Sequence, residues 1–305
     1  MSANSNIEVS LTSNIVYSVF CGAVQLSTLI GNTLICLVVL RNKHLQNFTT
    51  FLLVNLAVSD FMVGLFGTVH FLLALILKNE VEQVCRILDS ILFLSAAVSI
   101  YSLVLISAEK YLAIMKPFVR RTRVTVGLLR FIIPGVWIWS SILTSPLFYF
   151  LINGHNNRQE LFCWETFPQK PLKKPYKYFL FFALYLFPML ILCFIYARIV
   201  HRLWFESGSA KGTNIFLLRS RQKLTKMLAC VILVFNICWF PWFVVDIISA
   251  STDWIIKPSW FLLQLLSLFA VSNSSANVVI YWLQSQVFRR YMKNLLFCFN
   301  RQVQA

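Results

Sequence analysis

Seven apolar stretches, each close to or longer than the roughly 20 residues that a helix needs to cross a bilayer, constrain this chain most. Two of them, Leu45–Leu77 and Ile87–Ala108, carry one acid each. The chain is 58% hydrophobic and 12% charged, whereas about 25% of the residues in a soluble domain are charged. We therefore predict an all-α, polytopic membrane protein with a seven-transmembrane helix bundle. The other five stretches carry no Lys, Arg, Asp or Glu: Ile15–Leu40, Phe131–Gly154, Tyr178–Ala197, Met227–Val245 and Pro258–Phe288.

One domain covering residues 1–299 accounts for all seven spans. After the last span, apolar residues in 286–298 recur at helical spacing against Arg289, Arg290 and Lys293. This pattern is typical of an amphipathic helix that lies in the membrane interface. Cys298 near its end is either a palmitoylation site or a plain buried cysteine, and residues 300–305 form a short tail. The predicted spans are about 15–40, 45–77, 82–115, 125–151, 174–204, 221–250 and 257–284.

The basic residues predict the orientation. With seven spans, 19 of the 27 Lys and Arg residues fall on one side, and such an excess marks the cytoplasmic side. The N-terminus is then extracellular. The formal charge of +16 therefore reflects this asymmetry and contact with anionic lipid, not nucleic acid. Four lysines fall on the outer side, where we expect a solvated loop: Lys170, Lys173, Lys174 and Lys177.

Asp60 lies in the second span, about 20 Å from either end by helical rise. A carboxylate at that depth needs polar partners. Ser99 on the third span and Asn273 and Asn277 on the seventh are the candidates, and the two asparagines share a helical face because they are four residues apart. These oxygens suit either a small monovalent cation or a hydrogen-bonded cluster with a protonated or water-bridged Asp60.

Pro146, Pro188 and Pro241 each fall inside an apolar span. A proline there frees a backbone carbonyl and permits a kink. Pro241 stands in the sequence "CWFPW", where large aromatic residues flank it. Such a helix suits either a two-state switch or a static packing kink.

Taken together, these residues resemble the rhodopsin-like G-protein-coupled receptors, and the resemblance covers essentially the whole chain. Each motif is short, but all of them occur in order on seven spans. The motifs are "GN" (31–32), "NLAVSD" (55–60), Cys85 placed 25 residues before Lys110, Trp137 with Pro146, "FP" (187–188) with Tyr196, and "CWFP" (238–241).

The resemblance implies roles for several residues. Asp60, Ser99, Asn273 and Asn277 match the family's sodium pocket, and sodium is the only bound ion that we expect. Cys85 and Cys163 match its disulfide, and both fall on the oxidising outer side. Further positions match the family's switch and G-protein contacts: Ile100, Glu109, Lys110, Tyr111, Phe118, Pro188, Tyr196, Phe235, Pro241 and Tyr281.

Two departures from the family pattern concern signalling. Lys110 stands where the family has arginine, and lysine lacks the planar fork that donates several hydrogen bonds at once. We expect Lys110 to take the arginine's place and reach toward Tyr196 and the G protein. Val278 replaces the proline of the family's seventh-span motif, whereas Asn277 and Tyr281 keep its polar groups.

The predicted ligand site is apolar and aromatic, with acids at its outer mouth. Leu92 stands where amine receptors carry aspartate, and Val271 where opsins carry lysine, so the resemblance disfavours a biogenic amine and retinal. A peptide whose basic or amidated end meets Asp89 or Asp246 is favoured. A lipid or neutral small molecule is the alternative. The predicted lining residues are His70, Asp89, Leu92, Phe93, Ala96, Leu180, Phe181, Leu184, Trp239, Trp242, Phe243 and Asp246.

The sequence thus predicts a receptor in the plasma membrane that activates a heterotrimeric G protein. A transporter would need internal repeats and a path of charged sites, and a membrane enzyme would need clustered catalytic groups. We find neither pattern, so we expect no enzymatic activity. An atypical receptor with weak G-protein coupling remains an alternative because of Lys110.

Overall fold

The computed structural model describes residues 2–76, 82–153, 170–206, 215–252, 259–286 and 288–294. These residues are almost entirely helical, and none of them forms a strand. Seven of the helices are long and apolar enough to cross a membrane, so the predicted seven-helix fold is confirmed. The main helices are α1 (Ser2–Arg41), α2 (Phe48–Ile76), α3 (Glu82–Met115), α5 (Leu129–Asn153), α6 (Lys170–Phe181), α7 (Phe187–Val200), α8 (Ile215–Ser251) and α9 (Trp260–Gln284).

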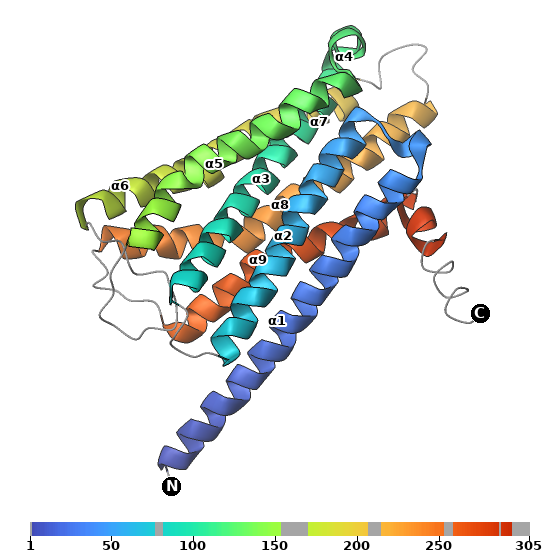
Figure 1. Cartoon of the computed structure of the whole chain (residues 1–305). Helices are drawn as coiled ribbons and strands as arrows, with labels where there is room; N and C mark the ends of the chain where they lie inside the picture. The colour runs from blue at the N-terminus through green and yellow to red at the C-terminus, as the bar shows by residue number, and fades with distance from the viewer. Residues whose placement is uncertain are drawn as a thin grey trace.

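The long helices lie side by side in one bundle, with α3 in contact with α2, α5 and α7 (Figure 1). α1 begins at Ser2 rather than near residue 15, and its first turns project beyond the other helices (Figure 1). A short helix at 288–294 turns away from the end of α9 (Figure 1), which places a helix where the amphipathic segment was predicted. Large apolar side chains face outward, such as Phe194, Phe131 and Leu283, as the lipid-facing surface of a membrane protein requires.

The end of α3 shows how the sequence delimits an element. α3 ends at Met115, and Pro117 occupies the first turn of the next helix, α4 (Pro117–Arg123). Proline fits there because the first amides of a helix have no intrahelical acceptor. The end of α3 thus agrees with the end of the third predicted span at about residue 115.

Pro188 reshapes the span that contains it. The residues before it, η4 (Phe182–Leu186), form a π-helical turn, and the amide of Phe187 donates to the carbonyl of Phe182. Because Pro188 has no N–H, the carbonyl of Ala183 is left without a helical donor. The hydroxyl of Tyr101 on α3 donates to this carbonyl at 2.8 Å. The freed carbonyl predicted for Pro188 is thus used to join two helices.

Polar side chains of the "NLAVSD" stretch tie α2 to its neighbours. The Asn55 amide donates to Ser102 on α3 at 2.8 Å. The Trp137 indole on α5 donates to the Asn55 carbonyl oxygen at 2.9 Å. Since a buried polar group that lacks a partner is costly, this three-helix contact fixes the rotation of α2 about its axis, and with it the direction in which Asp60 points.

Candidate functional site

The Asp60 carboxylate is 1% exposed and accepts hydrogen bonds from two other helices. Asn277 donates to Oδ2 at 2.9 Å, and Ser274 donates to Oδ1 at 2.9 Å, both from α9. Ser99 on α3 lies at the limit of hydrogen bonding, 3.5 Å from Oδ1. Three of the four predicted residues therefore meet, and Ser274 was missed.

Asn273 is buried beside this group, but no hydrogen bond to Asp60 joins the two. The side-chain carbonyl oxygens of Asn273 and Asn277 are both buried and make no hydrogen bond among the described residues. Hard cations bind oxygen ligands of this kind. The carboxylate, the serine hydroxyls and the two unpaired carbonyl oxygens therefore fit a small monovalent cation. No cluster of His, Cys, Asp and Glu that suits a transition metal occurs among the described residues.

The "GN" pair of α1 packs against α9 next to this site. Asn32 donates to Ser274 O at 3.4 Å and to Thr28 O at 2.9 Å. A Cβ added to Gly31 would lie 2.5 Å from a methyl of Val278, so this close approach requires glycine. Val278, which replaces the expected proline, thus fills the contact between α1 and α9.

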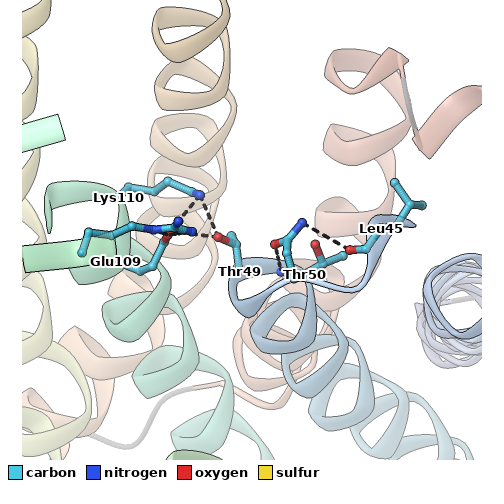
Figure 2. A network of polar contacts seen from close by, with 7 residues as sticks. Leu45, Thr49, Thr50, Glu109 and Lys110 are labelled. Carbon is cyan, nitrogen blue, oxygen red and sulfur yellow. Dashed lines mark hydrogen bonds and ion pairs between the residues drawn. The ribbon is translucent and has the colours of Figure 1, made fainter. Parts of the chain in front are cut away.

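A second buried acid, Glu109, lies at the opposite end of the spans from the Asp246 region and is 3% exposed. Its Oε2 accepts a hydrogen bond from Thr49 at 2.8 Å and lies 2.8 Å from Lys110 Nζ. Its Oε1 accepts from Arg120 Nε at 3.0 Å, with Arg120 Nη2 also at 3.0 Å. Figure 2 shows Glu109 and Lys110 facing Thr49 at the start of α2. We call Thr49, Glu109, Lys110 and Arg120 the Glu109 cluster.

Asn47 fixes the position of Thr49. Its backbone carbonyl accepts from the amide of Phe51 at 3.0 Å, and its side chain accepts from the amide of Thr50 at 3.1 Å. This is the geometry of an N-cap, for which asparagine is among the preferred residues. The cap thereby starts α2 at Phe48 and orients Thr49 toward α3 (Figure 2).

Lys110 does not reach Tyr196, contrary to the sequence-based expectation. Its amine donates to Thr49 at 2.8 Å and pairs with Glu109. The physical reason is that a carboxylate and a hydroxyl lie together on that side, whereas Tyr196 offers only one hydroxyl. The Tyr196 hydroxyl is buried and makes no hydrogen bond of ordinary geometry among the described residues. Arg120 and Thr49 were not predicted.

Three more of the predicted switch and G-protein-contact residues lie at this end of the bundle. Tyr281 is buried and stacks on Phe288 of the short terminal helix at 6.1 Å. Phe118, on the first turn of α4, is 84% exposed. Tyr111 packs against the cluster formed by Ile195, Ile199 and Leu203.

The predicted ligand-site aromatics pack together and continue along α8. Phe181 contacts Phe243 at 6.0 Å, Phe243 contacts Trp239 at 6.0 Å, and Trp239 stacks on Phe235 at 6.1 Å. Tyr185, which was not predicted, lies 5.2 Å from Phe243 and donates to Asn236 at 2.9 Å. Ile100, Pro188 and Phe235, three of the predicted switch residues, are buried, and their role as a switch stays a prediction. Several predicted lining residues belong to this same core: Phe93, Leu180, Phe181, Leu184, Trp239, Trp242 and Phe243.

The acids of the predicted outer mouth are not simply solvated. Asp246 pairs with Lys177 at 2.8 Å, and the side chains are 12% and 4% exposed, respectively. All four lysines belong to helix α6, so the expectation of a loop there is wrong, and Lys177 is in addition buried rather than solvated. Asp89 is also buried, at 6%. Leu92 and Ala96 on α3 are partly buried.

Four predicted residues lie outside what the structure describes. The side chains of His70 and Cys85 are not described, although both residues belong to helices. Cys163 and Cys298 lie outside the described residues altogether. The disulfide, the palmitoylation site and the role of His70 therefore stay predictions.

Comparison with known proteins identifies similar chains. A family model described as "7 transmembrane receptor (rhodopsin family)" matches residues 31–281. Neuropeptide FF receptor 1 of Rattus norvegicus is 29% identical over 86% of this chain and 66% of its own length. The QRFP-like peptide receptor of Branchiostoma floridae is 27% identical, over 95% and 80%, respectively. Galanin receptor type 1 of Mus musculus is 28% identical, over 93% and 82%. The chain thus spans just under two thirds of the neuropeptide FF receptor.

Proposed function

Because this chain belongs to the rhodopsin family of seven-transmembrane receptors, we propose that it binds an extracellular peptide and activates a heterotrimeric G protein. The observation that carries this proposal is the family match over the bundle together with two relatives whose names include a peptide or neuropeptide ligand. In this arrangement the N-terminus is extracellular, the protein lies in the plasma membrane, and the Glu109 cluster faces the cytoplasm.

The structure supports a route from ligand to G protein. A ligand that packs against Phe181 or Phe243 displaces rings that contact Trp239 and, through it, Phe235. Phe181 ends α6 and precedes Pro188, whereas Phe235, Trp239 and Phe243 lie in α8 on either side of Pro241. A ligand shifts a helix-packing equilibrium only by its differential affinity for the two states, so a ligand that acts by this route would have to contact these rings differently in the two packings.

The charged residues at the mouth refine the ligand chemistry. Asp246 is already paired with Lys177, so a basic group of the peptide must either displace Lys177 or share the carboxylate with it. An amide end can instead join the pair, because it donates through N–H and accepts through C=O.

A sodium ion would bind at Asp60 with oxygen ligands from Ser99, Ser274, Asn273 and Asn277. It would supply the positive charge that the neutral donors around Asp60 lack. These residues join α2, α3 and α9, so an ion held by them would favour one packing of these helices over another.

The test is G-protein dissociation in cells that display the receptor at the surface. We would challenge them with a pool of amidated and basic peptides, with the same peptides as free acids, and with a lipid pool. We expect a response to the peptides that weakens in Asp246→Ala. A response to lipids alone would contradict the peptide assignment. Silence in the wild type with signalling in Lys110→Arg would identify an atypical receptor.

A further inference from the structure

Glu109 has one negative charge and two cationic partners, and each partner occupies its own carboxylate oxygen. Arg120 takes Oε1 through Nε and Nη2, both at 3.0 Å. Lys110 and Thr49 take Oε2, both at 2.8 Å. The cluster therefore carries one positive charge more than Glu109 neutralises. Either cation can leave without removing the last counter-ion of a buried acid.

The two cations belong to different elements. Lys110 follows Glu109 on α3, and its side chain is 16% exposed. Arg120 belongs to α4 and is 38% exposed. α4 also carries Phe118, which is 84% exposed, so the bonds of Arg120 to Glu109 tie the element that presents Phe118 to the end of α3.

We propose that Arg120 is a positioning residue that holds Glu109 when Lys110 leaves it to contact the G protein. This inference rests on the proposed function. Lysine at position 110 has a mobile point charge and no planar fork, whereas arginine binds a carboxylate through several donors of fixed geometry. Arg120 thus supplies the fork that Lys110 lacks, and it does so from a neighbouring helix. Without Arg120, release of Lys110 would leave Glu109 with only the Thr49 hydroxyl, and an unpaired buried acid is strongly unfavourable.

The first experiment measures how tightly Glu109 holds Lys110 and needs no ligand or G protein. Purified receptor in lipid nanodiscs is treated with formaldehyde and cyanoborohydride, and methylation of Lys110 is compared with that of exposed Lys116 by mass spectrometry. We expect Arg120→Gln to lower the Lys110 to Lys116 ratio about threefold, the factor that a partly exposed ion pair supplies. The double variant Glu109→Gln/Arg120→Gln should restore the ratio or exceed that of the wild type. Arg121→Gln, at the exposed neighbouring position on α4, is the matched control and should leave the ratio unchanged.

The second experiment measures binding of a panel of nucleotide-free G proteins to the same samples. We expect Arg120→Gln to weaken binding about tenfold, Arg120→Lys to weaken it less, and Glu109→Gln/Arg120→Gln to recover it, because the acid that retains Lys110 is gone. Equal losses in the single and double variants would mean that Arg120 contacts the G protein directly, which overturns the proposal. An unchanged methylation ratio in Arg120→Gln also overturns it. If the wild type binds no G protein in the panel while the methylation pattern is as expected, the proposed function fails. The inference that Arg120 holds Glu109 is then still supported by the methylation result.

Discussion

Asp60 and Glu109 are two buried acids of one bundle whose surroundings are opposite. Asp60 is 1% exposed and Glu109 is 3% exposed. The described donors to Asp60 are neutral serine and asparagine side chains. Glu109 has two cations and one hydroxyl. Burial alone therefore does not determine what an acid does in this protein.

The difference follows from depth in the membrane. Asp60 lies in mid-span, where a Lys or Arg side chain would itself be costly. Glu109 lies near the end of its span, next to segments rich in Lys and Arg. We infer that Asp60 is set up to receive a cation from solution, whereas Glu109 is already neutralised and clamps α2, α3 and α4 together.

A third acid, Asp246, extends the comparison because its described cationic partner is a single buried lysine, Lys177. Lys177→Ala would leave Asp246 without the partner that now lies 2.8 Å away. Removing one partner of a buried pair costs about 3 kcal/mol, so we expect the largest loss of thermal stability of the variants discussed here. The measurement is the melting temperature of purified receptor in detergent. The exchanged pair Lys177→Asp/Asp246→Lys is the control and should recover most of the loss. A melting temperature equal to that of the wild type in Lys177→Ala would show that the pair contributes nothing to stability.

Glu109→Gln and Asp60→Asn remove the same charge from the two compared sites. Glu109→Gln leaves Lys110 and Arg120 without their acid, and we expect a cost of about 2 kcal/mol, reduced from the buried limit because Arg120 is partly exposed. Asp60→Asn leaves no cation unpaired among its described contacts, so in sodium-free buffer we expect a change of at most about 1 kcal/mol. Melting temperatures of the two variants check this order. A larger decrease in melting temperature for Asp60→Asn than for Glu109→Gln would contradict the proposed difference between the two sites.

How much of this could be predicted depends on where the signal lies in the sequence. Seven apolar stretches, five of them without any charged residue, predict the seven spans, because a soluble fold would leave too much apolar surface unburied. The Asp60 site followed from Asn273 and Asn277 at a spacing of four, but Ser274, three residues before Asn277, lies on the same helical face and was overlooked. The spacing of Lys170, Lys173, Lys174 and Lys177 is also helical, and it could have indicated that α6 starts there.

The Glu109 cluster could be predicted only in part. Glu109 and Lys110 are adjacent in sequence, so their pairing is a local expectation. Thr49 and Arg120 come from two other helices, 60 and 11 residues away. Their arrival depends on the Asn47 cap and on the Pro117 start of α4, neither of which specifies a partner. Contacts of this kind require the folded arrangement.

Sodium provides the next test of the comparison. If Asp60 receives a cation, wild-type receptor should melt at a higher temperature in sodium chloride than in choline chloride of equal ionic strength. Binding at ten times the dissociation constant adds about 1.4 kcal/mol. Asp60→Asn should abolish this difference, whereas Glu109→Gln should retain it. Equal melting temperatures of the wild type in both salts would count against the sodium site.

Thr49→Val should have the smallest effect. The Thr49 hydroxyl donates to Glu109 and accepts from Lys110, both at 2.8 Å, and valine keeps its shape while removing both bonds. Lys110 still pairs directly with Glu109 at 2.8 Å, and Arg120 still occupies the other oxygen, so no charge is left unpaired. Both lost bonds go to charged groups, but each charged group keeps its ionic partner, so we expect a loss of less than about 1 kcal/mol, measured as a small decrease in melting temperature. A loss as large as that of Glu109→Gln would mean that the hydroxyl, rather than the two cations, holds the acid, and the contrast between Asp60 and Glu109 would disappear.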